Sequence, residues 1–372
     1  MKIFIASHRT EIYGPVQALI NYLKSKKKKF KYILHPLPSS KIEFSEYGEF
    51  NFKKSFIYKK IKNIKISEPF LYLQHLILNL YFLFRQKDKI DIYIGIDNLN
   101  AFSGIIFKWL GKINKVIYYV IDYTPKRFKN PILNYLYHKL DKFCAKHSDY
   151  VWNISKRIAK IREKQGISEE KNLVVPVGIE LEKIKIPPLE NVRRNIIVFV
   201  SHLEKSKGIQ LAIEAMEIIS KKYPNAVLEI IGTGPYENEL KKMVKEKGLE
   251  RNVKFLGAME HDRLMKYLPT CGIALATYVN DPSSITYYAD PTKPKEYLAC
   301  GLPVIITKVP WIAEEIEKKP MGIAINYNKD ELISAFIRLL TDDNFYKLCR
   351  ENAIKFTKNL SWEKIFDEAF SK

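Results

Sequence analysis

One stretch decides the fold of the second half of the chain: DPTKPKEYLACGLPVI, residues 290–305. Its prolines predict a loop that opens a short helix, since proline is tolerated in the first helical turn. Gly301 predicts the end of that helix, and an apolar strand follows. The free N–H groups and positive dipole of the helix start suit a diphosphate, and Lys293 and Lys295 add positive charge.

The same residues also allow a simpler interpretation. Asp290 could cap an ordinary helix, and Glu296 could be favoured there by the helix dipole alone. Local chemistry leaves both readings open.

Short β-rich runs alternate with helix-length segments on both sides of this stretch, which predicts parallel sheets with crossover helices. In the first half we expect strands at 2–7, 30–36, 90–95, 115–122, 150–155 and 172–177, and helices at 16–25, 70–86, 100–110 and 131–147. In the second half we expect strands at 195–203, 226–232, 252–257, 272–277, 302–307 and 322–327, and helices at 208–223, 235–248, 293–300, 330–341, 344–357 and 361–371.

The region 181–194 has two adjacent prolines and no clear period, so we predict an interdomain linker there. The simplest account is two successive doubly wound α/β domains at 1–185 and 190–358, with a C-terminal helix at 360–372 that packs back onto the first domain. Such sheets bind ligands at the carboxyl ends of their strands. We therefore expect the site in a cleft between two facing domains.

Residues 290–305 resemble the donor-site signature of family 4 glycosyltransferases, P-x-K-x-x-E-Y-x-A-x-G-x-P-V-I. The resemblance implies the retaining GT-B fold, with a nucleotide-diphosphate sugar as donor. It implies that Glu296 accepts hydrogen bonds from ribose hydroxyls. It also places Asp290, Pro291, Thr292 and Lys293 at the donor site.

A second segment, SHLEKSKG at 201–208, is similar to the family's G-R-x-x-x-x-K-G. In the family, the Arg and Lys neutralise the departing diphosphate, a task that suits a lysine at a strand end. Lys207 matches this pattern, whereas His202 stands at the Arg position and Ser201 at the first Gly. Lys207 then carries more of the charge, with help from protonated His202; the alternative is a solvated loop lysine.

Two further turns of the second half resemble the family. IIGTGP at 230–235 is similar to a donor-domain turn in which Gly232 and Gly234 shape the backbone, and the strand that ends with Phe255, Leu256 and Gly257 corresponds to the one that contacts the base. The family's E-x7-E pattern is incomplete, because Tyr288 stands where the first Glu is expected. A buried strand followed by a turn would account for Leu256 equally well.

The first half resembles the family more weakly. Gly14 lies in a loop similar to the glycine-rich loop that approaches donor and acceptor, with Pro15 in place of a second glycine. Asp122 matches the Asp of a strand that ends in H-D, but Ile121 replaces the His. In the mechanism proposed for this class the leaving phosphate takes the acceptor proton, so the missing His does not imply lost activity. Gly14 in a simple turn and Asp122 in a structural role are the alternatives.

Charge is concentrated in the first half. The chain has a net charge of +21, and residues 1–190 carry 35 Lys and Arg against 17 Asp and Glu. Two basic runs, 24–31 and 53–65, place lysines beside aromatic or β-branched residues, which suits an anionic membrane surface. Solvated loops and a plainly Lys-rich composition are the alternatives.

Other features limit the class of protein. No nucleic-acid motif accompanies the charge, no apolar stretch reaches the ~20 residues of a membrane span, and the start is too short for a secretory signal. The four cysteines form no C-x-x-C pair or zinc pattern, and no D-x-D cluster is present, so we expect a cytoplasmic protein that needs no metal or other cofactor.

The sequence thus predicts a glycosyltransferase that is peripheral on the inner face of the cell membrane. Its expected partners are a nucleotide sugar, a lipid-linked or glycan acceptor and an anionic membrane surface, with no nucleic acid. The expected catalytic residues are Lys207, Glu296 and Asp122. The alternatives are a GT-B enzyme of another reaction, such as a sugar-nucleotide epimerase or an inverting transferase, and a non-catalytic polyanion-binding protein.

Overall fold

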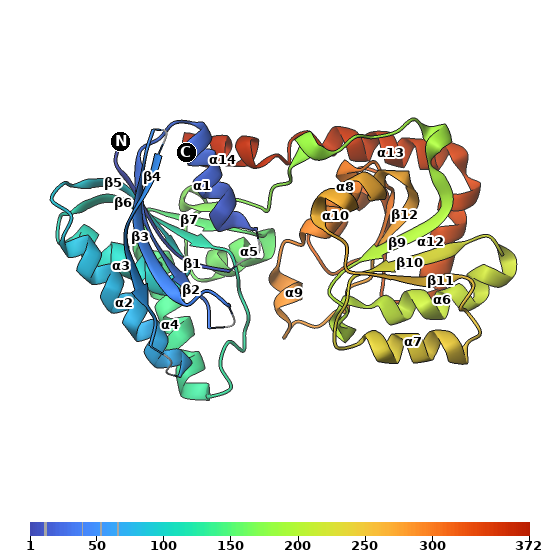
Figure 1. The fold of residues 1–372 in the computed structure, drawn as a ribbon, viewed down its shortest axis with the longest axis horizontal. Helices are drawn as coiled ribbons and strands as arrows, with labels where there is room; N and C mark the ends of the chain where they lie inside the picture. Colours follow the sequence, from blue (N-terminus) through green and yellow to red (C-terminus); the bar gives the residue numbers. More distant parts are fainter. Residues whose placement is uncertain (11–12, 39, 53, 65–66) are drawn as a thin grey trace. The chain divides into compact units, whose positions relative to one another are not determined.

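The computed structural model describes residues 1–372 apart from 11–12, 39, 53 and 65–66, and apart from the side chain of residue 183. The chain divides into two compact units (Figure 1), one made of residues 1–177 and 365–372 and the other of residues 178–364. Each unit is built around one sheet with helices on both of its faces, as the alternation of strands and helices predicted.

The first unit holds an eight-stranded sheet in the order β4-β3-β2-β1-β5-β6-β7-β8. Its strands are β1 (Ile3–Arg9), β2 (Phe30–Pro36), β3 (Phe44–Asn51), β4 (Lys54–Lys62), β5 (Ile90–Ile96), β6 (Ile113–Val120), β7 (Tyr150–Asn153) and β8 (Asn172–Val174). Its helices are α1 (Pro15–Ser25), α2 (Glu68–Phe84), α3 (Asn98–Trp109), α4 (Pro131–His147) and α5 (Lys156–Lys164). Helices α2, α3 and α4 pack in that order.

The second unit holds a six-stranded parallel sheet in the order β11-β10-β9-β12-β13-β14. Its strands are β9 (Arg193–Val200), β10 (Val227–Ile231), β11 (Val253–Gly257), β12 (Cys271–Ala276), β13 (Val304–Thr307) and β14 (Gly322–Ile325). Its helices are α6 (Ile209–Lys222), α7 (Glu237–Glu246), α8 (His261–Tyr267), α9 (Ile285–Tyr288), α10 (Thr292–Ala299), α11 (Ile312–Lys318), α12 (Lys329–Thr341) and α13 (Asp343–Thr357). Its short 3-10 turns are η2 (Leu181–Lys183), η3 (Leu189–Asn191), η4 (Lys205–Lys207) and η5 (Leu268–Thr270), whereas η1 (Glu169–Lys171) belongs to the first unit.

Strand β9 shows why the second sheet is covered on both sides. Alternate side chains of a strand point to opposite faces. Ile197 and Phe199 lie in one apolar cluster with α6, α7 and α12, whereas Ile196 and Val198 lie in another with α8, α10 and α11. Both faces of the strand are buried from residue 196 to residue 200, so this part of its sequence is a continuous apolar run.

Each sheet has one place where two neighbouring parallel strands are followed by connections that run toward opposite edges of the sheet. The order of connection reverses between β1 and β5 in the first sheet and between β9 and β12 in the second. In open α/β sheets, ligands bind outside the carboxyl ends of the strands at such switch points. Each unit therefore has one edge at which a site is expected.

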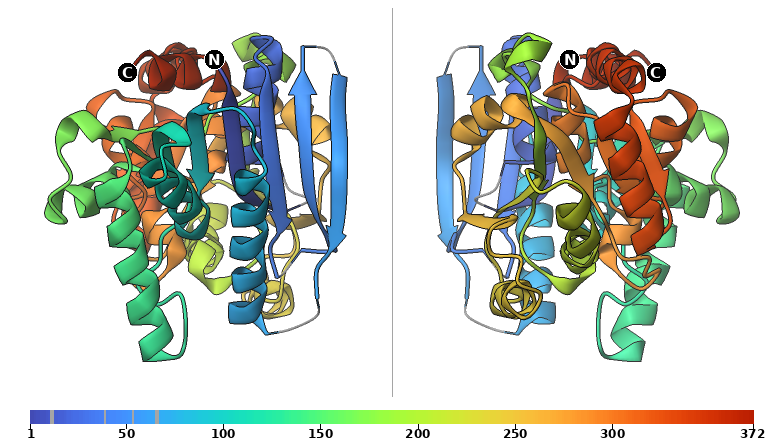
Figure 2. Two further views of the ribbon diagram at one scale, coloured as in Figure 1. Left: turned by 90° about the vertical axis from the view of Figure 1, so that its left-hand side faces the viewer. Right: turned by 90° about the vertical axis from the view of Figure 1, so that its right-hand side faces the viewer.

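The sequence patterns missed one feature of the first sheet. Residues 44–51 and 54–62 pair as an antiparallel ribbon, β3 and β4, at the sheet edge (Figure 2), where we expected a loop or a membrane-binding run. Strand β4 is exposed on both faces apart from Ile61, so its residues lack the in-out alternation that identifies a strand. Lys53 and Lys65, the ends of the predicted basic run, lie outside the described residues.

The C-terminal helix α14 (Trp362–Ser371) packs on the first unit through its last residues. Tyr22 donates a hydrogen bond to Asp367 at 2.7 Å, and Lys26 pairs with the same carboxylate. The ring of Phe370 stacks on Tyr22 and meets the edge of Trp152. The predicted linker 181–194 belongs to the second unit, where β9 begins within it at Arg193 because residues 193–200 pair with β10 and β12.

Candidate active site

The predicted donor residues gather at the carboxyl edge of the second sheet. Lys207 follows β9, Gly232 follows β10, Leu256 is the next-to-last residue of β11, and α10 precedes β13. Helix α10 is fixed against β9 because the hydroxyl of Tyr297 accepts a hydrogen bond from the Val200 N–H at 2.8 Å. The switch point between β9 and β12 thus carries both motifs that the sequence singled out.

Lys207 ends the turn η4 and is half-buried. Its Nζ donates a hydrogen bond to Thr286 Oγ1 of α9 at 3.2 Å. Burial lowers the pKa of Lys207, and nearby Glu204 opposes that shift. A cation kept partly out of water interacts more strongly with an anion than a solvated one does, so this is not an ordinary loop lysine.

Gly208 explains why a glycine follows this lysine. It has φ of 75°, and a Cβ there would lie 1.6 Å from the carbonyl oxygen of Thr277. That backbone position is fixed by a second contact, since Thr277 Oγ1 donates to the Gly208 carbonyl at 3.0 Å. Only glycine lets η4 pass this closely over the end of β12.

We expect Gly208→Ala to destabilise the second unit by roughly 2 kcal/mol or more, because the methyl group adds a clash to a left-handed backbone. Gly248→Ala is the matched control, since Gly248 has φ of 64° with nothing within 4 Å of the added Cβ. Guanidinium denaturation of both variants measures the difference. Equal losses would mean that backbone strain alone, and not the contact with Thr277, requires glycine at 208.

Glu296 lies in the second turn of α10 and is buried, with 6% of its surface exposed. Its Oε1 is 3.2 Å from Nε2 of His261, the first residue of α8, and its Oε2 accepts from Lys293 Nζ at 2.7 Å. Both oxygens are therefore held in fixed directions. Sequence analysis missed His261, which lies a few residues after β11 and outside every family motif that we considered.

The structure gives Asp290 and Lys295 a different role from the predicted one. Both side chains are fully buried and form an ion pair with each other, and the indole N–H of Trp311 donates to Asp290 at 2.8 Å. Pro291, not Asp290, is the N-cap of α10, and no side chain caps the helix. The charge of Lys295 is thus neutralised inside the protein, whereas Thr292 and Lys293 lie partly exposed at the helix start.

The remaining donor-side predictions fall into two groups. Gly232 and Gly234 shape the turn, because a Cβ would lie 1.9 Å from Ser201 O at the first and 2.3 Å from Leu203 O at the second. His202 and Leu256 instead present side chains to solvent, with His202 3.5 Å from Glu204 and Leu256 41% exposed.

In the first unit, Gly14 is the N-cap of α1 and has extended backbone angles. Among the described residues, which leave out 11–12 of the same loop, a Cβ there would meet only Gln17 Oε1, at 3.9 Å. Neither conformation nor packing requires glycine at this position, so its effect is to leave the loop open to close approach by another group.

Asp122 is the second residue after the end of β6, at the wall of a cavity. Water reaches its carboxylate, yet the surrounding protein desolvates the charge and raises its pKa to about 6, against the opposing effects of the Tyr123 N–H and Arg127. This places a carboxylate with an altered pKa at the carboxyl edge of the first sheet.

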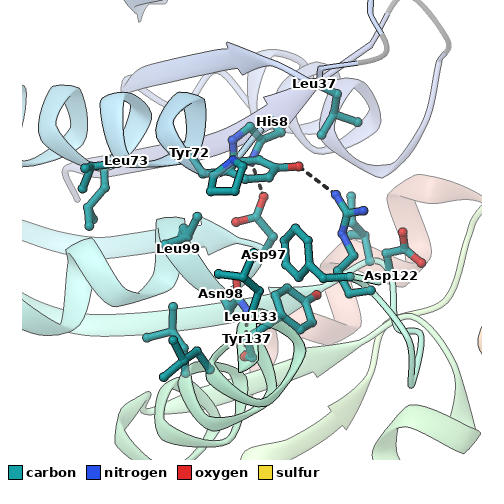
Figure 3. Close-up of a pocket in the computed structure, with 17 residues that line it drawn as sticks. His8, Leu37, Tyr72, Leu73, Asp97, Asn98, Leu99, Asp122, Leu133 and Tyr137 are labelled. Carbon is teal, nitrogen blue, oxygen red and sulfur yellow. Dashed lines mark hydrogen bonds and ion pairs between the residues drawn. The ribbon is translucent and has the colours of Figure 1, made fainter. Parts of the chain in front are cut away.

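Sequence analysis missed two residues beside it. Asp97 follows β5. Its backbone angles, φ of 71° and ψ of 169°, are ones that residues other than glycine rarely adopt. Its carboxylate faces Nδ1 of His8, the side chain near the end of β1 (Figure 3). The two strands flank the switch point, so this pair lies where a ligand is expected.

A buried polar network fixes the His8 ring. The Asp97 carboxylate only accepts, so His8 Nδ1 carries a proton and Nε2 accepts from His75 Nδ1 at 3.0 Å. His75 Nε2 in turn accepts from Asn63 at 3.1 Å. Burial and the neighbouring His8 lower the pKa of His75 to about 3, so this imidazole is neutral at physiological pH.

The described residues add three observations on the other predictions. Among them no group of three or more His, Cys, Asp or Glu side chains could hold a metal ion, and no helix is long and apolar enough to cross a bilayer. All four cysteines are buried and free. The basic run 24–31 is partly neutralised, because Lys26 pairs with Asp367 and Lys29 with Glu49.

The family match found by comparison with known proteins lies within the second unit. Residues 180–356 match the family described as "Glycosyl transferases group 1". An uncharacterized glycosyltransferase of Methanocaldococcus jannaschii is 30% identical over 175 residues, which cover 46% of this chain and 43% of that protein. The alpha-monoglucosyldiacylglycerol synthase of Streptococcus pneumoniae is 24% identical over 222 residues, or 54% of this chain and 48% of that enzyme. The chain therefore matches about half the length of these relatives.

A solved structure matches the whole chain. The crystal structure of HepE of Anabaena in complex with UDP superposes with a TM-score of 0.73 at 16% identity and covers 100% of this chain and 99% of that one. Together with the two Rossmann-like sheets, this match confirms the predicted GT-B fold.

Proposed function

We propose, from the match of residues 180–356 to the group 1 glycosyltransferases, that the chain transfers a sugar from a nucleotide-diphosphate sugar to a lipid-linked or glycan acceptor. The product would belong to a cell-surface polysaccharide, a glycolipid or a lipid-linked oligosaccharide. One observation carries the proposal: a desolvated lysine and an uncapped helix start lie at the same edge of the second sheet.

In this proposal the second unit binds the donor. Lys207 and the first N–H groups of α10 stabilise the diphosphate as it leaves, because both place positive charge where negative charge develops. Glu296 accepts hydrogen bonds from the ribose, which requires it to exchange its contact with Lys293 or His261 for the hydroxyls. Lys293 is then released toward the phosphates.

We expect one of UDP, GDP, ADP and TDP to raise the melting temperature of the protein, because a ligand that binds only the folded state stabilises it. Glu296→Ala should lose most of that shift. Lys254→Ala is the control, since this exposed side chain lies on β11 away from α10. A wild type that responds to none of the four nucleotides would overturn the proposed donor site.

Retention of configuration is part of the proposal and rests on the resemblance of residues 290–305 to retaining enzymes. In that mechanism the leaving phosphate removes the acceptor proton, so the first unit has mainly to position the acceptor. The anomeric configuration of the product, read by proton NMR before mutarotation, decides the matter. An inverted product would favour the His8–Asp97 pair as a base.

We also propose that the first unit binds an anionic membrane surface, and that it does so through α2 and not through the predicted basic runs. Five apolar side chains form one exposed stripe along this helix, here called the α2 stripe: Phe70 at 63%, Leu73 at 50%, Ile77 at 56%, Tyr81 at 43% and Phe84 at 71% exposed. Their spacing of three and four residues puts them on one helix face. Lys112 lies 4.6 Å above the ring of Phe84, and Arg85 lies beside Tyr81.

Apolar side chains flanked by cations suit a bilayer with anionic headgroups. We expect the protein to sediment with phosphatidylglycerol vesicles at about 0.15 M salt, and the double change Ile77→Ser and Phe84→Ser to abolish most of that binding. Leu348→Ser, on an exposed apolar residue of α13, is the control. Sedimentation seen only at very low salt, or unaffected by the double change, would contradict an apolar contact through α2.

A further inference from the structure

The first unit contains a cavity of about 370 Å³ between α2, α3 and α4. This volume lies within the range of small-molecule sites in proteins. The cavity is lined only by residues of the first unit, so it does not depend on the donor-binding half. Its two ends differ in chemistry.

One end is a wall of leucines. Figure 3 shows Leu73 of α2 and Leu99 of α3 on this side, and the other leucines come from α2 and α4: Leu76, Leu133, Leu136 and Leu140. Leu73 and Leu136 are also 50% and 52% exposed, so the wall continues to the protein surface. An apolar lining that is open to the surface, beside the α2 stripe, fits a hydrocarbon chain.

The opposite end carries the charged groups beside Leu37, with Asp122 at its far side and Asp97 between the two ends (Figure 3). The charge of Arg127, the cation of this end, is paired with Glu68, since its Nη2 donates to Glu68 and to Tyr72, each at 2.8 Å. Carboxylates accept hydrogen bonds from hydroxyls, whereas a phosphate or carboxylate head would meet two like charges. This end therefore suits a neutral, hydroxyl-bearing group.

Local strain also marks the polar end. Asp97 keeps a strained backbone conformation with φ of 71°, and its carboxylate is held by His8 and by Asn100, whose Nδ2 lies 3.1 Å from Oδ1. A strained residue that aims a fixed carboxylate into a cavity is an arrangement found at ligand sites. The groups that face Asp97 are thus the histidine network on one side and the cavity on the other.

We propose that this cavity binds an amphiphile with a neutral, hydroxyl-rich head at Asp97 and Asp122 and a hydrocarbon tail along the leucines. The assignment rests on the proposed function in one respect, namely that this amphiphile is the sugar acceptor. It narrows the acceptor to a lipid with an uncharged sugar or alcohol head and excludes a soluble glycan without a tail. The tail would enter from the membrane surface at which the α2 stripe lies.

Binding of a homologous series tests the tail. Titration calorimetry with methyl, hexyl, octyl and decyl β-glucoside, each below its micellar concentration, should show affinity that rises about fourfold per added methylene, as burial of a CH₂ predicts. The methyl glucoside should bind too weakly to detect. Affinity that does not depend on chain length would overturn the proposal.

Two neighbouring positions on α2 provide a matched pair of variants. Leu76→Trp fills the cavity and should remove the dependence on chain length, whereas Ile77→Trp places the same side chain outside it on the exposed face. Nucleotide-induced stabilisation should persist in both variants and so reports that the second unit is intact. Equal glucoside binding by the two variants would place the tail elsewhere.

Glucoside binding tests the cavity, and nucleotide-induced stabilisation tests the donor site, so the two proposals can fail independently. If a nucleotide stabilises the wild type and glucosides bind without regard to tail length, the cavity assignment falls and the donor site stands. If tails bind as expected but no nucleotide binds, the ligand class stands and its role as a sugar acceptor falls. Asp97→Asn and Asp122→Asn should weaken octyl glucoside binding by about tenfold each, the loss of one charge-assisted hydrogen bond.

Discussion

Lys207→Ala should lower the turnover number for sugar transfer by about 10²–10³-fold, the usual effect of removing one group that stabilises charge in a transition state. The lysine is half-buried, and burial lowers its pKa, so its charge is costly to keep unless an anion offsets it. The diphosphate gains negative charge as the sugar departs. The cation therefore acts on the transition state more than on the bound donor, and KM should change less than kcat.

The matched control is Lys205→Ala, two residues earlier in the same turn and exposed to solvent. Release of nucleoside diphosphate from the donor that the thermal-shift experiment selects provides the assay. Lys207→Arg keeps the charge but changes its shape, so partial rescue would show that charge, and not the hydrogen bond to Thr286, is what matters. Equal activity of the two alanine variants would remove Lys207 from the proposed mechanism.

Sequence patterns predicted the fold well where burial is two-sided. Strand β2, at the predicted 30–36, is buried along nearly its whole length, and β9 contains the apolar run 196–200. Most helices begin within two or three residues of the expected positions. The β3–β4 ribbon escaped because β4 exposes nearly every side chain, so neither alternation nor a continuous apolar run marks it. Its stability comes from pairing with β3, which no local pattern reports.

The site was predicted unevenly for a related reason. Lys207, Glu296 and the glycines of the turns lie in motifs of fixed spacing, and local backbone geometry explains several of them, as at Gly208 and Gly232. The cavity is assembled from helices far apart in sequence, so no motif contains it. Asp122 was singled out by its resemblance to a family motif, whereas Asp97 lies in no motif and could have been found only from its place directly after a buried strand.

Asp290 shows the opposite error, in which a motif residue has an internal role. A carboxylate next to a helix start is a natural N-cap, and two lysines nearby suggest a phosphate site. No local pattern in the sequence shows that Lys295, one turn into α10, points inward against Trp311. There it forms a buried ion pair with Asp290, which also accepts a hydrogen bond from the Trp311 indole. The pair instead fixes the helix on which the donor residues stand.

Lys295→Met should therefore cost about 3–5 kcal/mol of stability, because it leaves the Asp290 carboxylate buried with no opposite charge. Both side chains have no exposed surface, so water cannot replace the lost partner. Guanidinium unfolding followed by tryptophan fluorescence measures the loss, since Trp311 donates to the same carboxylate. The transition of the second unit should move to lower denaturant.

Two further variants decide whether the cost comes from the unpaired charge. Adding Asp290→Asn to Lys295→Met removes the charge yet keeps an oxygen for Trp311, so it should restore most of the stability. Lys293→Met is the comparison, because it breaks the ion pair that Lys293 forms with Glu296, three residues later in the same helix. The Lys293 side chain is 34% exposed, so this change should cost about 1 kcal/mol of stability or less. If the two lysine variants lose the same stability, burial of the Asp290–Lys295 pair does not hold α10 in place, and the position of Glu296 must depend on the Tyr297–Val200 contact instead.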